Sequence, residues 1–426
     1  MSFPKYPSYK DSGVEWLGEV PNHWDVKRLK QACHVLPSNV DKKCHDGETP
    51  IVLCNYTDVY YNEKITRTID FMAATASSEQ IAKFTLREGD TIITKDSETA
   101  DDIAVAAYVP ESLPGVVCGY HLSMVRPLPN TYGQFVTRLF GSVYAKSCFA
   151  ILANGLTRVG LGQYELDNVA LPFPPFEEQK LIASFLDRET SKINALVGEQ
   201  RRLIELLKEK RQAVISHAVT KGLNPNAPLK PSGIKWLGYV PEHWEVKPLK
   251  YLLSLTSGGT PSKENLAYWD GAVPWASSKD LKVAELFDTQ DHITQKALDD
   301  GAADLVPPGS ILTVVRGMIL LHTFPVVVAR VPMAINQDLK AVLPKPEITG
   351  DFLAWLLRGV SEEILSRTDE AGHGTKVLRI DTWLALQVPV PPKIEQSHIV
   401  IAIGKRLAEL DSLTAEAERA IELLKE

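Results

Sequence analysis

Cysteine and histidine are among the residue types of this 426-residue chain that could hold a metal ion, and all five cysteines lie in its first 150 residues. Cys44, His45 and Cys54 come nearest to a set of ligands. Structural zinc usually has two close pairs of ligands, however, and the chain has no CxxC pair. An odd number of cysteines also makes no disulfide framework. We therefore expect reduced, partly buried thiols and no metal site.

Sequence motifs of catalysis are missing from the chain. It contains no GxxxxGK[ST] phosphate loop, no GxSxG or HExxH motif and no glycine-rich dinucleotide turn. Phe173-Pro-Pro-Phe176 is similar to the Asn/Asp-Pro-Pro-aromatic loop of amino-methyltransferases, but Phe173 cannot accept a hydrogen bond from a base. We interpret its prolines as a helix start. The acidic pairs Asp101-Asp102 and Asp299-Asp300 are expected to be solvated charges rather than a nuclease site.

An internal repeat organises the chain. Residues 10–30 and 230–250 are identical at 14 of 21 positions, and the repeated block reads WLGxVPxHW. A second repeated block begins with Pro-Pro at positions 174 and 391 and reaches the hexapeptide IELLKE in both halves. The stretches between these blocks share only fragments. This pattern predicts two modules of one fold that present different surfaces.

Histidine and tryptophan recur inside the first repeated block. His23 and His243 could be a duplicated catalytic residue, but a structural histidine in a turn is the favoured interpretation. Two hypotheses remain open for the tryptophans. They pack each block against its own helix, or they form two symmetric binding sites for two copies of one partner. The tryptophans in question are Trp16, Trp24, Trp236 and Trp244.

The Pro-Pro blocks predict long helices, the first over residues 177–220 and ended by Gly222 and Pro225. Their apolar residues recur at a heptad spacing, which is typical of a coiled coil. We expect the two seams to pack on each other; the alternative is that each packs on its own module or on a partner. The first seam is Ile182, Leu186, Glu189, Ile193, Leu196, Gln200, Leu203, Leu207, Lys210, Val214 and His217, and the second is Ile399, Ile403, Arg406, Leu410, Leu413, Ala417, Ala420 and Leu424.

The two middle stretches predict mixed modules with much strand. Short β-rich runs at 91–95, 104–110, 311–315 and 325–331 are bounded by Gly, Pro or Asp, whereas 128–152 and 348–367 predict helices.

The net charge of −7 argues mildly against binding nucleic acid through bulk charge, but it leaves room for local basic faces or a basic partner. We find no apolar run of the ~20 residues that a membrane span needs and no signal peptide, so we expect a cytoplasmic protein with no membrane partner.

These blocks together resemble the specificity subunit (HsdS) of type I restriction-modification enzymes, over the whole chain. The second middle stretch is similar to one type of target recognition domain in that family, whereas the first lacks its GGTPS segment. The segments that carry the resemblance are Trp16–Trp24 and its copy at 236–244, PPFEEQ at 174–179, PPKIEQ at 391–396, HAVTKGL at 217–223, and Gly258–Lys263 with Tyr268-Trp269 and Val273-Pro-Trp275.

The resemblance implies an α+β fold with an internal pseudo-twofold repeat. Two mixed α/β target recognition domains (31–171 and 251–387) would be joined and spaced by two long antiparallel coiled-coil helices (172–222 and 388–426), with repeated frame segments at 1–30 and 223–250.

It also implies a noncatalytic subunit that reads a bipartite, asymmetric target in double-stranded DNA. Two methyltransferase subunits and two restriction-translocase subunits would join it. S-adenosylmethionine, ATP and Mg²⁺ would be bound by those partners, and no cofactor by this chain. The alternatives are a standalone DNA methyltransferase or nuclease, and a coiled-coil scaffold that binds only proteins.

Polar residues in glycine-rich or strand-end segments are the candidates for reading bases. For each one, an exposed loop residue without a role is the alternative. The candidates are Lys95, Asp96, Ser97, Tyr120, His121, Asn154 and Arg158 in the first module, and Ser257, Gly258, Gly259, Thr260, Pro261, Ser262, Lys263, Arg316, Asn336, Gln337 and Lys340 in the second.

Overall fold

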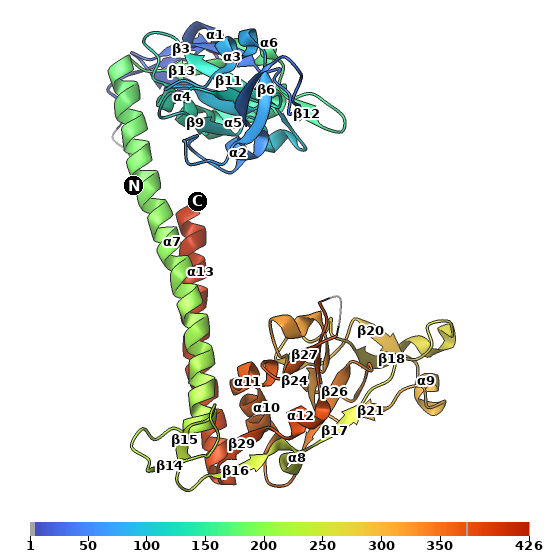
Figure 1. Ribbon diagram of the computed structural model, residues 1–426. Coiled ribbons are helices and arrows are strands. Elements are labelled where there is room, and N and C mark those ends of the chain that lie inside the picture. The colour runs from blue at the N-terminus through green and yellow to red at the C-terminus, as the bar shows by residue number, and fades with distance from the viewer. Residues whose placement is uncertain (1–4, 372–373, 426) are drawn as a thin grey trace. The chain divides into compact units, whose positions relative to one another are not determined.

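The computed structural model describes residues 5–371 and 374–425, which fall into two compact units, Met1–Asn194 and Ala195–Glu426. His373, which belongs to a short repeated fragment, lies outside the described residues. Helix α7 (Phe176–Lys221) belongs to both units, because it is continuous across their boundary (Figure 1). Each unit holds one module of mixed strands and helices and one repeated frame segment.

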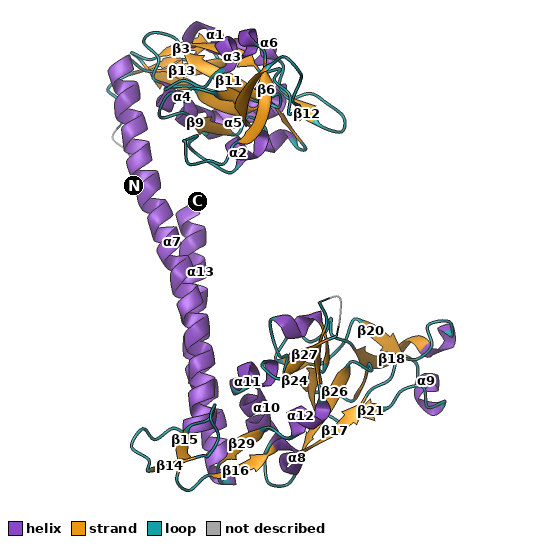
Figure 2. Ribbon diagram, viewed as in Figure 1, coloured by secondary structure: helices purple, strands orange, loops and turns teal. Residues whose placement is uncertain are grey.

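The first module is built on two sheets (Figure 2). An antiparallel sheet has the order β4-β11-β7-β9, with bounds Cys33–Pro37, Leu122–Pro127, Thr91–Thr94 and Ala106–Tyr108. The second sheet has the order β10-β5-β6, with bounds Val116–Cys118, Thr49–Cys54 and Met72–Ala76, and its β10–β5 pair is parallel. Helices α4 (Gly133–Phe140) and α5 (Val143–Leu152) bury Phe140 and Phe149 in a core with Ile93 of β7.

The second module repeats this plan. Its larger sheet has the order β17-β26-β22-β24-β19, with bounds Leu253–Ser257, Leu339–Pro344, Ile311–Val314, Val327–Ala329 and Glu285–Leu286. The other sheet is β20-β18-β25-β21, with bounds Asp291–Ile293, Trp269–Ala276, Met333–Ile335 and Leu305–Val306, and β18–β25 is again parallel. Helices α10 (Gly350–Gly359) and α11 (Ser361–Leu365) take the places of α4 and α5. The predicted common fold of the two modules is confirmed.

Each repeated frame segment is a small hairpin followed by a strand that pairs with the strand before a long helix. The hairpins are β1-β2 (Tyr9–Asp11, Glu19–Pro21) and β14-β15 (Leu229–Pro231, Tyr239–Pro241). The strand pairs are β3-β13 (Asp25–Arg28, Ala170–Phe173) and β16-β29 (Glu245–Pro248, Gln387–Val390). The prolines that follow β13 and β29 directly precede α7 and α13 (Lys393–Lys425), as the sequence predicts.

The predicted strands are confirmed as β7, β9, β22 and β24, but the predicted helices are shorter than expected. The stretch 128–152 forms two helices, and the first begins only at Gly133. The helices are separate because Ser142 caps the second one by accepting a hydrogen bond from the Ala145 amide. The stretch 348–367 likewise breaks between Gly359 and Ser361.

Helix α13 runs antiparallel beside the part of α7 that lies in the second unit (Figure 1), where Arg211 forms an ion pair with Asp411. The predicted seam of α13 is wrong at two positions. Arg406 is exposed and pairs with Glu409, and Leu413 is 47% exposed. The residues of α13 that are buried are Gln396, Ile399, Ile403, Leu407, Leu410, Ala417 and Ile421.

The helices depart from the predicted seams for two reasons. In α13 the buried stripe takes a step of four from Ile403 to Leu407 and then a step of three to Leu410, which is the reverse of the predicted order. In α7 much of the predicted seam is exposed: Leu186, Ile193, Leu196, Leu203, Lys210 and His217. Its last turns pack on the second module, so Ile215 and Val219 are buried beside Gly359.

Within the described residues, no single helix is long and apolar enough to cross a membrane; α4 with α5, bent by 70°, would pass by length and composition alone. That part of the chain also holds no group of three or more His, Cys, Asp or Glu side chains that could bind a metal ion. Cys44 is exposed and Cys54 is buried, in keeping with free thiols.

Candidate nucleic-acid interface

Five candidates of the first module gather around Asp96. This residue begins β8 (Asp96–Ser97), which pairs with β12 (Val159–Gly160). Its carboxylate lies 2.7 Å from His121 Nδ1 and accepts a hydrogen bond of 2.9 Å from the Arg158 guanidinium. The Lys95 ammonium lies 4.5 Å from the centre of the Tyr120 ring, and burial lowers the pKa of Lys95.

The other two candidates of this module have different surroundings. Ser97 is buried, and its backbone pairs with Val159 of β12. Asn154 is exposed, and its backbone pairs with Gly160 next to Arg158.

Sequence reasoning missed several residues that share a hollow with Tyr120 and His121. Lys42, Lys43, Asn55 and Tyr56 line a hollow of about 240 Å³ together with Tyr120 and His121. The adjacent lysines were the one available signal, because two cations in a loop are a common way to contact phosphate.

In the second module the structure brings the segment Ser257–Lys263 against the turn that follows β25. A Cβ on Gly258 would lie 2.0 Å from the Ile335 carbonyl oxygen, so glycine is required for this approach. The Gly259 amide donates to the same oxygen at 2.9 Å. Side chains add two links across the gap, from Lys340 to Ser257 (2.5 Å) and from Thr260 to Gln337.

Three predicted residues of the second module do not present free polar groups beside this loop. Asn336 is nearly buried, and its side-chain oxygen accepts hydrogen bonds from the Asp338 and Leu339 amides, both at 3.1 Å. Pro261 is buried. Arg316 is exposed on another small sheet, where β23 (Arg316–Gly317) pairs with β28 (Lys376–Leu378).

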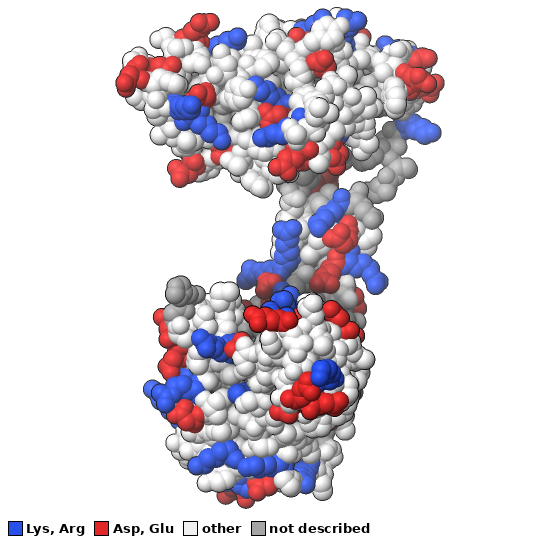
Figure 3. All heavy atoms as spheres, turned by 90° about the vertical axis from the view of Figure 1, so that its right-hand side faces the viewer, with Lys and Arg blue, Asp and Glu red and all other residues white. Residues whose placement is uncertain are grey.

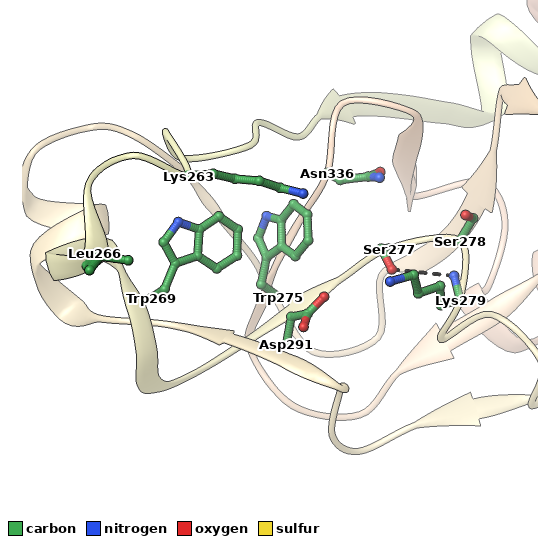
Figure 4. A pocket seen from close by; sticks show the side chains of 9 residues that line it. All are labelled: Lys263, Leu266, Trp269, Trp275, Ser277, Ser278, Lys279, Asp291 and Asn336. Carbon is green, nitrogen blue, oxygen red and sulfur yellow. Dashed lines mark hydrogen bonds between the residues drawn. The ribbon is translucent and has the colours of Figure 1, made fainter.

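Two tryptophans that were not predicted as site residues lie beneath the loop (Figure 4). Trp269 and Trp275 meet edge to face, with ring centres 5.2 Å apart. Their indole N–H groups donate to the carbonyls of Ser262 (3.1 Å) and Gly259 (3.0 Å). With Lys263, Lys279, Asp291 and neighbouring residues they line a hollow of about 480 Å³.

The candidate sites occupy the same place in the two modules. Cys118 pairs with Cys54 across parallel strands, as Ile335 does with Ala276. The next amide donates at 2.9 Å to the partner strand in both modules, from Gly119 and from Asn336. Tyr120 and His121 therefore correspond to Gln337 and Asp338. By the sequence offset of 220, Asp96 corresponds to Arg316, and each begins a two-residue strand.

The histidines and tryptophans of the frame segments bind a glutamate of the following helix. Glu178 lies 2.8 Å from His23 Nε2 and accepts from the Trp24 indole at 3.2 Å. In the copy, Glu395 makes the same contacts with His243 (2.7 Å) and Trp244 (3.0 Å). These contacts support the structural interpretation of both histidines.

The next glutamine of each helix is buried and completes the junction. Gln179 accepts from the Tyr132 amide, and Gln396 accepts from the Thr349 amide, both at 2.8 Å. The repeated Glu-Gln pair therefore joins frame segment, helix and module in each half.

The four tryptophans proposed as partner anchors differ in exposure. Trp244 is fully buried, which fits the hypothesis that it pins the frame segment to its helix. Trp16 is 76% exposed, whereas Trp24 and Trp236 are half-buried. A partner contact through these residues stays a prediction, and Trp16 is the most exposed of the four.

Cationic and anionic side chains are mixed on the face shown in Figure 3, in each unit taken separately. This distribution agrees with the net charge of −7. Neither unit shows a broad basic field on that face, so its electrostatic attraction for phosphate is local.

Comparison with known proteins decides the family. The model of the type I restriction modification DNA specificity domain matches residues 21–206 and 241–423, one copy in each half. The chain belongs to this family. It is therefore the specificity component of a type I restriction-modification system, with DNA-recognition domains and a place in a larger complex, and it is not a catalytic subunit.

Relatives and solved structures agree with this assignment. The EcoR124I/EcoR124II specificity subunit of Escherichia coli is 27% identical over 268 residues, 62% of either chain. A candidate specificity subunit of Methanocaldococcus jannaschii (MjaX) is 25% identical over 97% of this chain and 92% of its own.

Two solved structures show the same fold at 18% identity. A chain solved in work on complex assembly of the type I R-M system has a TM-score of 0.71, with 95% of each chain covered. The HsdS subunit of Thermoanaerobacter tengcongensis has a TM-score of 0.56, with 95% of this chain and 96% of that chain covered.

Proposed function

We propose that each module of this specificity subunit reads one half of a bipartite, asymmetric target in double-stranded DNA. The observation that carries the proposal is the pair of equivalent sites with unlike side chains. Tyr120 and His121 stand on the same backbone framework as Gln337 and Asp338. Like frameworks with unlike side chains are what two independent readers of unlike half-sites require.

The chemistry of each site suits a groove of DNA. Arg and Lys pair with guanine, and Asn and Gln pair with adenine, in the major groove. In the first module Arg158 is more than half exposed beside Asp96, and Lys42 and Lys43 are available for phosphates. In the second, Lys263 and Gln337 are exposed at the loop.

The long helices set the spacing between the half-sites in this proposal. Helix α7 has 46 residues, which corresponds to about 69 Å at 1.5 Å per residue. Modules held about one DNA turn apart, roughly 34 Å, would meet the same face of the duplex.

Partners supply the catalysis and the cofactors in this proposal. The frame segment occurs twice, so two methyltransferase subunits bind, one to each copy, and two restriction-translocase subunits complete the enzyme. S-adenosylmethionine, ATP and Mg²⁺ are bound by those subunits, and this chain works in the cytoplasm, where the DNA lies.

Genome-wide mapping of methylated bases tests the proposal in cells that express this subunit with its methyltransferase. A bipartite, asymmetric motif is expected. Exchange of residues 31–171 for the equivalent segment of a related subunit should change one half of that motif only. A change in both halves would show that the modules are not independent readers. Methyl transfer to DNA by this chain alone, from labelled S-adenosylmethionine, would favour the enzyme alternative.

A further inference from the structure

We propose that Trp269 and Trp275 are positioning residues that determine specificity in the second module, because their indole N–H groups hold the backbone of Gly258–Lys263 in its reading conformation. The inference rests on the proposed function, because it assigns a role within one half of the proposed DNA site. Neither residue needs to touch a base.

The contacts of the loop divide into main-chain and side-chain links. Its main chain forms four hydrogen bonds: the Gly259 amide donates to Ile335 O (2.9 Å), the Gly259 carbonyl accepts from Trp275 (3.0 Å), and the Ser262 carbonyl accepts from Trp269 (3.1 Å) and from the Asn265 amide (3.2 Å). Its outward side chains, Ser262 and Lys263, are exposed. Two of these four bonds come from the indoles, so the indoles contribute to the shape of the loop, while its surface is set by other residues.

The two indoles are themselves fixed. Trp275 is 6% exposed and packs in a small core with Ile293, Ala297 and Ala334. Its ring contacts that of Trp269 edge to face, so the packed Trp275 also restricts the motion of Trp269. Figure 4 shows Lys263 running above both rings, with its amino group toward Asn336. A ring held by packing loses little entropy when it binds a carbonyl, so it is an effective support for a loop of glycine and small residues.

Replacement by phenylalanine separates the hydrogen bond from the packing. Trp269→Phe with Trp275→Phe removes both N–H donors and keeps an aromatic ring at each position. Each lost bond should weaken discrimination between the correct and an altered half-site by up to about fivefold, because a neutral hydrogen bond contributes about 1 kcal/mol. The loss should affect only the half of the motif that the second module reads.

Trp383→Phe is the matched control. Trp383 is fully buried in the same unit, and its indole nitrogen has no hydrogen-bond partner among the described residues. The control therefore reports the effect of the smaller ring on stability. Melting temperature is measured for each variant, and Trp269→Phe alone, at a half-buried position, decides the question if the double variant does not fold.

Methylated bases are mapped in cells that express each variant with the methyltransferase. Relaxed reading of one half-site in the Trp269 and Trp275 variants, but not in Trp383→Phe, supports the inference. An unchanged motif overturns it, as does equal relaxation of both halves. If the unaltered subunit directs methylation to no bipartite motif, the proposed function itself fails, and the inference with it.

Discussion

Gln396 provides a sharp test of how each long helix is joined to its recognition module. Its side chain is fully buried, accepts from the Thr349 amide (2.8 Å), and donates to the carbonyls of Glu347 (3.2 Å) and Pro391 (2.9 Å). Leucine fills a similar volume but offers neither a donor nor an acceptor. Gln396→Leu therefore leaves three backbone groups without their partner.

The expected cost follows from those three groups. A buried polar group that loses its partner lowers the free energy of unfolding by about 1–3 kcal/mol. Glu347 and Thr349 are not buried, so water can replace part of their lost hydrogen bonds. The total loss for the three groups is therefore about 3 kcal/mol. For a unit of about 230 residues, each kcal/mol lowers the melting temperature by about 2–4 °C, which gives about 6–12 °C.

Differential scanning calorimetry of the full chain measures the effect. Gln387→Leu is the matched control, because Gln387 is exposed and its side chain has no hydrogen bond among the described residues. It should change the stability by less than about 0.5 kcal/mol. Gln179→Leu should destabilise the first unit similarly, since Gln179 bonds the Tyr132 amide and the Pro174 carbonyl. If Gln396→Leu melts like Gln387→Leu, the junction does not depend on this buried amide.

Three further predictions concern acid, thiols and spacing. Burial raises the pKa of Glu178, but hydrogen bonds from Tyr6, His23 and Trp24 outweigh it and hold the pKa below its usual value. The ionised Glu178 therefore stabilises the folded chain above the unfolded-state pKa of about 4.3, and this stabilisation is lost as the pH falls below that value. The free energies of unfolding in urea of the unaltered chain and of Glu178→Gln should therefore become equal as the pH falls below about 4.3. Burial raises the pKa of Cys33 to about 12 and that of Cys54 well above its usual value, so iodoacetamide at neutral pH should label the exposed Cys44 first in mass spectra; equally fast labelling of Cys54 would contradict its burial. Insertion of one heptad near Gln200 should lengthen the unread spacer in the methylated motif and leave both half-sites unchanged; altered half-site bases would show that the helices are not spacers.

The features that the sequence predicts correctly are those with a local or repeated signal. The duplicated frame, the β-rich runs and the long helices follow from patterns within a few residues of each other. A fixed alternation of steps places the seam of α13 at Arg406, whereas the apolar Leu407 is the residue that is buried, because the neighbours of the helix in space decide which stripe is covered. The break before Ser142 shows the same limit, since a cap outweighs an apolar pattern.

The candidate site was predictable in part for the same physical reason. Asp96, His121 and Arg158 follow strands or lie in loops that meet at one edge, and their polarity marked them. The pair Lys42-Lys43 and the segment that holds Trp275 were visible in the sequence, but their places beside the site depend on how distant segments pack. Asn336 had the expected polarity but uses it for its own turn.

The attachment of the Gly258–Lys263 loop through its own carbonyls bears on how new specificities arise. Because Gly259 and Ser262 are held by backbone atoms, substitutions at Ser262 or Lys263 leave the anchoring bonds in place. The loop can thus exchange the chemical groups that it displays one at a time, at little cost to folding. During selection for a new DNA target, single substitutions at these positions would be tolerated even before they improve binding to that target.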